Sequence, residues 1–464
     1  MITLSPAVSL MLEMFALLFS NRWIARWQQS SECPVGKQGT ARRFYQRIFS
    51  LRVTLWYLIY QRLSFDSTLA AVVTDVRQGG ADRLGRRGRK LSTRVRSTKT
   101  GAYNQARQRL PLELLVAALA HLGTLLCKQV GYESAPRCRP GPAGRTRQLL
   151  DGSTLAILAT PELVREFPPA GNKKGPSDWC LMRILVGFCA RSGAILSAIS
   201  GPVQHSEQAL AWALMAQARA FTVWIGDRNF GVWSVVAKAV RHQQDVVVRL
   251  TKTRARKLCA GRPMQSGEDR ALQWQPSRHD QVAPDTARKA VTGRLIYVRL
   301  LKAGRYIDLW LFTTLPVNDY PVALLVAWYG QRWQAELHFR SVKTQLKMAE
   351  LDVSTPQMAR KEFYAGLLAY SLVRAVMWSA GERLEEGIKT CSFSQARRIL
   401  QTRLQDWGCG LAGDAEQWAQ EMVRETARHT LPKRRKLRPS EVRRVRHRRQ
   451  KFPPLTGSRA AARA

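Results

Sequence analysis

The sequence has few acidic residues and few cysteines for its length. Its 464 residues include 33 Asp and Glu against 74 Lys and Arg, which gives a formal net charge of +41 at pH 7. The eight cysteines are scattered, with no CxxC pair and no Cys/His pair at zinc spacing. This excludes a disulfide scaffold and a zinc module, and we expect reduced, buried cysteines in a cytoplasmic protein.

Long uncharged apolar runs are also missing. No stretch reaches the roughly 18 apolar residues that a membrane helix needs, so no membrane-spanning helix, and no membrane partner through one, is expected. The N-terminal run VSLMLEMFALLF contains Glu13 and follows no basic region, which favours a buried helix over a signal peptide. The large positive charge predicts a polyanionic partner. Nucleic acid is the first candidate, and an anionic membrane surface is the weaker one.

Residues 1–145 predict a helical region with a basic segment. Apolar runs at 8–19 and 51–63 show no strand alternation. Residues 77–110 are rich in Arg, Lys and Gly, which indicates either a flexible linker or an arm that lies on DNA phosphates. Helices are then expected over AYNQARQRL and over PLELLVAALAHL, the second ending at Gly123.

The pattern changes to strands after residue 145. RQLLDGSTLAIL, LMRILVGFCA and GAILSAIS predict three strands, and a helix opened by Ser206 follows. The runs AFTVWIGDRNF and DVVVRL predict two more strands, with the helix GVWSVVAKAVRH between them. Strands and helices in this order predict a mixed α/β fold, in which helices cover a mixed sheet.

Four segments complete the predicted organisation. The α/β domain covers 146–250 and 319–385, and LIYVRLL and RYIDLWLFTT make 251–318 a β-rich insertion. PVALLVAWYGQRWQAELHFRSVKTQL predicts one long helix, and AGLLAYSLVRAVMW predicts a core helix. Residues 386–464 form a C-terminal region. Its tail at 433–451 has eleven basic residues and one acid, and it contains too few apolar residues to fold alone.

Four residues of the predicted long helix carry the strongest functional signal. Arg332, Glu336 and Lys343 follow Tyr329 at +3, +7 and +14. At about 100° per residue, the four fall within a stripe about 60° wide. One acid among cationic donors can hold a metal ion beside a phosphate; the alternative is a surface salt bridge at i,i+4. His338, about 160° from Glu336, is expected at the surface and not as a ligand.

Two aspartates complete a set of three carboxylates. Asp151 interrupts an apolar strand, and Asp227 ends another at a strand-to-turn junction. An acid in such a place is unfavourable unless it is paired or holds a cation, although both residues could instead cap turns. Together with Glu336 they offer the oxygen donors that Mg²⁺ and Mn²⁺ prefer. Two such ions about 4 Å apart cut and join phosphodiester bonds.

Asp151 in LLDGST, Asp227 in WIGDRNF and the Y-x2-R-x3-E-x6-K run at 329–343 closely resemble the insertion-sequence-four group of bacterial transposases. These are DDE enzymes with the YREK signature. TGAYNQARQRLP, TPEL, SEQAL, LLAYSLVRAVM and KFPPL also resemble that family, and the similarity covers most of residues 40–455. One departure is Ala159, where relatives usually carry a polar or acidic residue.

The resemblance implies a ribonuclease-H-like catalytic domain. Its first acid lies on the first strand, its second follows the fourth strand, and its glutamate lies on a later helix. Asp227 and Glu336 are 109 positions apart, a gap that the family fills with a β-rich insertion. An aromatic residue there can stack on a flipped base. Trp310 and Trp274 are the candidates, and a packed aromatic is the alternative. Alignment on the following Thr-x-x-Pro puts Leu309, not Trp310, at the expected position.

The family further implies a transposase that binds terminal inverted repeats, cuts the element's ends, forms a DNA hairpin and joins the freed 3′-hydroxyl to target DNA. Asp151, Asp227 and Glu336 would be the catalytic residues and would bind two Mg²⁺ ions, which Mn²⁺ can replace. DNA phosphates would be bound by Tyr329, Arg332 and Lys343.

The expected partners are double-stranded DNA and a second copy of the chain. The copies would form a homodimer in the synaptic complex through the region after about 385, and the expected location is the bacterial cytoplasm, at the nucleoid. The helical N-terminal region would read the repeats. The alternatives are a non-catalytic transposition repressor or inactive copy, a structure-specific nuclease, and an RNA-associated basic protein.

Overall fold

A computed structural model describes residues 20–34, 47–85, 89–129, 144–172, 175–302, 304–384 and 387–432. The described residues up to Thr430 belong to one compact unit. The apolar run at 8–19 and the basic tail with KFPPL lie outside the described residues. All seven cysteines within the described residues have free thiols.

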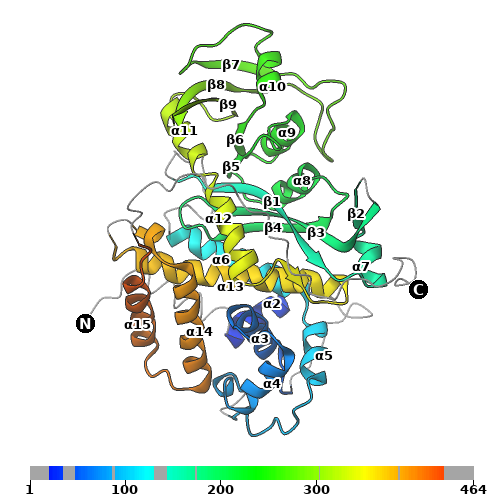
Figure 1. The fold of residues 1–464 in the computed structure, drawn as a ribbon, viewed down its shortest axis with the longest axis vertical. Helices are drawn as coiled ribbons and strands as arrows, with labels where there is room; N and C mark the ends of the chain where they lie inside the picture. Colours follow the sequence, from blue (N-terminus) through cyan, green and yellow to red (C-terminus); the bar gives the residue numbers. More distant parts are fainter. Residues whose placement is uncertain are drawn as a thin grey trace. The chain divides into compact units, whose positions relative to one another are not determined.

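A mixed sheet lies at the centre of this compact unit (Figure 1). Its core has the order β4-β3-β1-β5-β6, where β3 is antiparallel to β1 and β4, and β1, β5 and β6 are parallel. These strands are β1 (Arg147–Ile157), β3 (Gly175–Cys189), β4 (Ile195–Pro202), β5 (Val223–Gly226) and β6 (Asp245–Arg249). The short strands β2 (Pro169–Asn172) and β10 (Glu350–Leu351) pair with β3 and β1. The predicted mixed α/β class is confirmed.

The strands expected in the insertion are present, and they extend the same sheet. After α10 (Lys252–Leu258), an antiparallel ladder forms from β7 (Asp269–Trp274), β8 (Val291–Lys302) and β9 (Arg305–Thr313). Strand β9 also pairs with β6, through Val247↔Thr313 and its neighbours, which gives the order β6-β9-β8-β7. The insertion is therefore joined to the core by backbone hydrogen bonds.

Helices cover both faces of the core strands. Successive side chains of a strand point to opposite faces, so neighbouring residues pack against different helices. Trp224 and Val246 pack with α8 (Glu207–Gln217) and α9 (Trp233–Arg241). Ile225 and Val247 belong to the core that contains α6 (Leu112–Gln129), α12 (Gln334–Arg340) and α13 (Pro356–Gly381). The continuous apolar runs of β5 and β6 are thus explained by burial on both faces.

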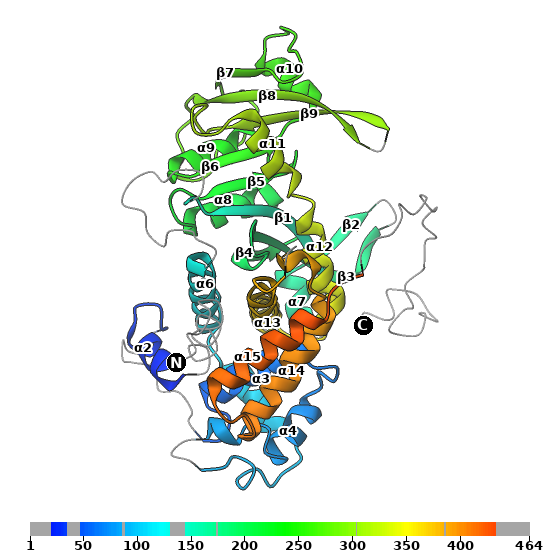
Figure 2. The same ribbon diagram turned by 90° about the vertical axis from the view of Figure 1, so that its left-hand side faces the viewer.

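The core helix predicted from AGLLAYSLVRAVMW is confirmed as part of α13 (Pro356–Gly381). It is long and apolar enough to cross a membrane, but 89% of its apolar window is buried inside the protein. It contacts α3 (Leu51–Leu63), α6 (Leu112–Gln129), α14 (Phe393–Cys409) and α15 (Ala415–Arg428) (Figure 2). Pro356 occupies the first turn, where its missing N–H leaves no hydrogen bond unmade.

The N-terminal region is helical as predicted. Within the described residues its other helices are α2 (Asn21–Gln29), α4 (Leu69–Arg77), α5 (Gly101–Arg109) and a 3₁₀ turn at Asp82–Leu84. The described part of the basic segment is packed and not a flexible linker. Asp82 accepts hydrogen bonds from both the N–H and the hydroxyl of Ser92, and Leu91 is buried in the main core.

Helix α6 continues through Gly123 to Gln129, so the predicted end at Gly123 is wrong. A β-carbon at Gly123 would lie 3.4 Å from the carbonyl oxygen of Ile195 and from the Cα of Leu196. The glycine therefore permits a close approach of α6 to β4 and does not end the helix.

Candidate active site

Asp151 and Asp227 lie side by side at one edge of the parallel strands. Leu150 in β1 pairs with Gly226 in β5, so the two aspartates directly follow a paired position. The Asp227 carboxylate accepts a hydrogen bond of 2.8 Å from the backbone N–H of Asn229, which closes the turn after β5. Asp151 accepts one of 3.1 Å from the backbone N–H of Gly152. Both aspartates are half-buried.

Burial raises the pKa of Asp151 to about 6. The positive charge of Arg332 and the Gly152 N–H lower it, whereas the charges of Asp227 and Glu207 raise it further. Neighbouring carboxylates disfavour one another's ionised form unless a cation lies between them. The pair therefore has the donor chemistry of a site for a hard divalent cation.

We expect replacement of Asp151 by asparagine to stabilise the metal-free protein by ~3 kcal/mol at neutral pH. A carboxyl whose pKa is raised by folding destabilises the folded state at every pH above that pKa. The penalty is fully present above about pH 6 and is removed as the pH falls from there toward 3.8. The measurement is urea unfolding of both proteins in EDTA between pH 7 and about pH 4.5. A difference that stays constant over this range would contradict the assigned pKa.

The predicted long helix is broken at its middle. Helix α11 (Val322–Gly330) ends at a glycine, which is a poor helix former. The N–H groups of Arg332 and Gln334–Glu336 then bond to carbonyls three residues back, as in a 3₁₀ turn. Helix α12 (Gln334–Arg340) follows and passes into a π-turn, η4 (Ser341–Gln345). The prediction of one continuous helix is wrong.

Part of the predicted stripe nevertheless gathers beside the aspartates. Arg332 donates a hydrogen bond of 2.9 Å to Glu336, and its charge also acts on Asp151. The Glu336 side chain is 65% exposed. Tyr329 is half-buried between the α11 end and β6, and burial raises its pKa. Lys343 lies one segment further on, in the π-turn.

The structure thus brings together Asp151, Asp227, Tyr329 and Arg332. Glu336 forms an ion pair with Arg332. Among the described residues, no three His, Cys, Asp or Glu side chains are placed to hold one metal ion together. The aspartate pair fits a divalent cation, but Glu336 is engaged by the arginine. Release of that ion pair would free the third carboxylate.

Two residues that the sequence did not single out also reach this site. Arg249 ends β6, one position after the Gly226↔Val248 pair, and its positive charge acts on Tyr329, whose pKa it lowers. Glu207, the first residue of α8, accepts a hydrogen bond of 2.6 Å from the Asn229 side chain. Glu207 belongs to the SEQAL run, so a signal for it was present in the sequence.

His338 is buried, and its predicted surface position is wrong. It lies in the same turn as the buried residues Ala335 and Phe339, with its ring 5.1 Å from that of Phe188. Burial lowers its pKa well below the ordinary value, and the charge of Arg374 lowers it further. The histidine is thus a neutral part of the core.

Trp310 and Trp274 are both buried in the structure. The Trp310 ring stacks on Tyr297, with ring centroids 4.2 Å apart and an angle of 17° between the planes. Trp274 packs against Phe312. Leu309 points to the opposite face and joins the other core. The packed alternative describes both tryptophans here, and stacking of Trp310 on a DNA base would require it to leave Tyr297.

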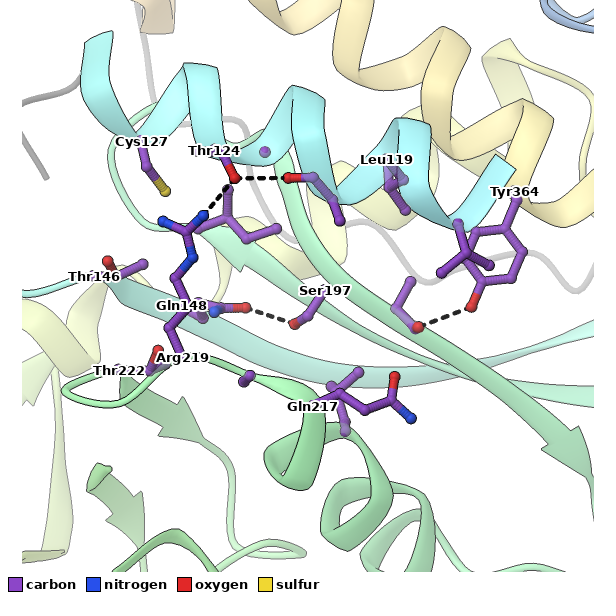
Figure 3. A pocket seen from close by; sticks show the side chains of 17 residues that line it. Leu119, Thr124, Cys127, Thr146, Gln148, Ser197, Gln217, Arg219, Thr222 and Tyr364 are labelled. Atoms are coloured by element: carbon purple, nitrogen blue, oxygen red, sulfur yellow. Dashed lines mark hydrogen bonds between the residues drawn. The ribbon is translucent and has the colours of Figure 1, made fainter. Parts of the chain in front are cut away.

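A pocket of about 180 Å³ lies elsewhere, among α6, β1, β4 and the loop after α8 (Figure 3). Arg219 reaches across it to the Thr124 hydroxyl at 2.5 Å, and Gln148 accepts a hydrogen bond from Ser197. None of the predicted site residues lines it. It is separate from the acidic site.

Comparisons with known proteins find similarity to transposases. Residues 142–372 match the family model described as "Transposase DDE domain". The chain is 24% identical over 292 residues to "Transposase InsG for insertion sequence element IS4" of Escherichia coli (strain K12), with 61% of this chain and 62% of that protein covered. It therefore spans less than two thirds of that relative's length.

Two shorter matches are also to transposases of insertion sequence elements. The chain is 32% identical over 81 residues to "Putative transposase InsL for insertion sequence element IS186A" of Escherichia coli (strain K12) and to "Transposase for insertion sequence element IS421" of Escherichia coli. Each match covers 18% of this chain and 21% of the relative. A solved piggyBac transposase synaptic complex with hairpin DNA aligns over 89% of this chain and 84% of that one. The TM-score is 0.41 and the identity 11%.

Proposed function

Since this chain belongs to the transposases with a DDE domain, we propose that it is a metal-dependent enzyme that cuts DNA at the ends of a mobile element and joins them to new DNA. The observation that carries the proposal is the pairing of Asp151 with Asp227 beside the Arg332–Glu336 ion pair. An acidic pair next to a guanidinium suits phosphodiester chemistry, which needs both a divalent ion and a phosphate-binding group.

The catalytic domain is proposed to be ribonuclease-H-like, over 146–250 and 319–385, with the insertion at 251–318. The strand order β4-β3-β1-β5-β6, with Asp151 on the first strand and Asp227 after the fourth core strand, supports it. Residues 1–145 and 386–464 are proposed as the DNA-binding and C-terminal regions.

Asp151, Asp227 and Glu336 would hold two Mg²⁺ ions, which Mn²⁺ can replace. When bound, the ions would activate a water or 3′-hydroxyl and stabilise the leaving oxygen. Arg332 would release Glu336 and bind a DNA phosphate through its two-pronged guanidinium. Lys343 would act on a phosphate as a point charge, and the Tyr329 hydroxyl would donate to another.

The proposed partners are the terminal inverted repeats, target DNA and a second copy of the chain in a synaptic homodimer. A net charge of +41 supports a DNA partner. A hairpin intermediate and a place at the nucleoid in the bacterial cytoplasm belong to the same proposal. The second candidate is a DNA-binding repressor or inactive copy. Among the described residues no three carboxylates are placed to hold one metal ion, since Glu336 is engaged by Arg332, and this favours the second candidate.

The test uses DNA that carries the native gene with its flanks, incubated with Mg²⁺ and either the wild type or Glu336→Gln. Products are resolved on native and denaturing gels. End cleavage with hairpin and strand-transfer products, absent with the variant, is the expected result. Equal DNA binding without cleavage by either protein would favour the repressor. Cleavage without joined products would favour a nuclease.

We expect deletion of 433–464 to weaken the salt dependence of DNA binding. The tail at 433–451 carries eleven basic residues. The slope of log K against log[salt] is negative, and it becomes less steep by about 0.9 for each phosphate that the protein no longer neutralises. The measurement is fluorescence anisotropy with a random duplex at several salt concentrations. An unchanged slope would exclude the tail from phosphate binding.

A further inference from the structure

The first turn of α8 contacts both aspartate-bearing segments. Glu207 and Gln208 both hold Asn229: the Glu207 carboxylate accepts from the Asn229 side-chain amide at 2.6 Å, and the Gln208 amide donates to the Asn229 carbonyl at 2.9 Å. Asn229 in turn donates its backbone N–H to Asp227. One chain of hydrogen bonds therefore runs from α8 through Asn229 to Asp227.

The same carboxylate lies against the other aspartate's strand. A β-carbon built on Gly152 would stand 2.5 Å from Oε1 of Glu207, closer than such atoms ever approach. Glycine at this position is therefore required for the carboxylate to lie over the backbone next to Asp151. Ser206 caps α8 through the Ala209 N–H, so the helix begins at a fixed point.

We propose that Glu207 is a positioning residue of the active site, whose carboxylate, lying over Gly152 and bound to Asn229, fixes the turn of Asp227 against the strand of Asp151. This inference rests on the proposed function, since it assigns Glu207 to the same site. The residue acts through the hydrogen bond and needs no direct contact with DNA. Groups that orient metal-binding residues from behind typically contribute 10- to 100-fold to metal affinity or activity.

A competing explanation is that Glu207 only stabilises α8. An acid in the first turn is favourable because it complements the helix dipole, and that benefit would not depend on Asn229. The two explanations differ in what glutamine does at this position. Its amide oxygen can accept the same hydrogen bond from Asn229, whereas it lacks the charge that interacts with the dipole.

The experiment uses the full-length protein and the variants Glu207→Ala, Glu207→Gln, Asn229→Ala and the double variant Glu207→Ala/Asn229→Ala. Two quantities are measured: the rate of end cleavage with Mg²⁺, and the affinity of the DNA-free protein for Mn²⁺ by calorimetry. Each alanine variant is expected to lose about 10- to 100-fold in both. The double variant should lose no more than the worse single variant, because the two residues share one bond.

Glutamine is expected to restore both quantities to within about threefold of the wild type, since the hydrogen bond is kept. The variant Gly152→Ala tests the position of the Glu207 carboxylate independently. Its methyl group should displace the carboxylate and impair cleavage, but add little to the loss already caused by Glu207→Ala. Gel-shift affinity for DNA and the unfolding midpoint should stay unchanged in Glu207→Gln.

Three outcomes would overturn the proposal: alanine variants with wild-type values, losses in the double variant that multiply, or a glutamine variant as impaired as alanine. If the wild type does not cleave DNA at all, the proposed function fails. The Mn²⁺ affinities would still decide whether Glu207 positions the aspartates.

Discussion

Replacement of Asp227 by asparagine is expected to lower the rate of DNA end cleavage by about 10³-fold or more. Asparagine keeps the size of the side chain and still accepts the Asn229 N–H, so the turn after β5 should survive. It removes one negative charge from the Asp151–Asp227 pair, which is the charge that a divalent ion requires. The measurement is a single-turnover cleavage assay with saturating protein and Mg²⁺.

Asp319→Asn is the matched control, because it makes the same chemical change on an exposed side chain before α11. Its cleavage rate should equal that of the wild type. DNA binding by Asp227→Asn should be retained or slightly tightened, since a negative charge near phosphates is removed. A cleavage rate within about tenfold of the wild type would remove Asp227 from the chemistry.

The second large effect is expected at Glu362, on α13. Its side chain is 2% exposed and forms ion pairs with Arg62 of α3, at 2.5 Å, and with Arg107 of α5. Removing one partner of a buried ion pair leaves an uncompensated charge. We expect Glu362→Ala to destabilise the protein by about 3–5 kcal/mol, because two partly buried guanidinium groups would be left together without their acid.

Urea unfolding at neutral pH measures this change, and Glu166→Ala is its control. Glu166 pairs with Arg360 on the surface, where both side chains are accessible, and such pairs contribute about 1 kcal/mol or less. Burial alone would raise the pKa of Glu362, but Arg62 and Arg107 lower it below 4.5. The stabilisation is therefore present above pH 4.5 and is lost as the pH falls through the lowered pKa. Equal losses of stability in both variants would contradict this account.

Local patterns predicted the strand ends on which the site is built. Asp151 and Asp227 stood out because each interrupts or ends an apolar run, and parallel strands then place them side by side. The Arg332–Glu336 pair depended only on a spacing of four residues, so it survived the helix break. The fold class followed from the order of strands and helices in the same way.

The errors share a different physical cause, which is contact between distant segments. Gly123 looked like a helix end because its contact with β4, a strand far along the chain, cannot be read locally. His338 was expected at the surface because its packing partners Phe188 and Tyr370 lie far away along the chain and cannot be read from the helix itself. Arg249 was missed for the same reason, since it enters the site only through tertiary pairing. Glu207 lies in the SEQAL run, but its role depends on its contact with Asn229, which the run does not show.

The continuous sheet has a consequence for engineering by exchange of modules. Strand β9 is hydrogen-bonded to β6 through Val247↔Thr313, Val248↔Phe312 and Arg249↔Leu311. A chimera that swaps 251–318 for a relative's segment must therefore reproduce this register, because a slip of one residue turns every side chain of β9 to the wrong face. Such a slip would also shift the ladder that ends at Arg249, beside Tyr329. A graft that is joined only at the ends of the insertion, without regard to this register, would therefore change the geometry of the site.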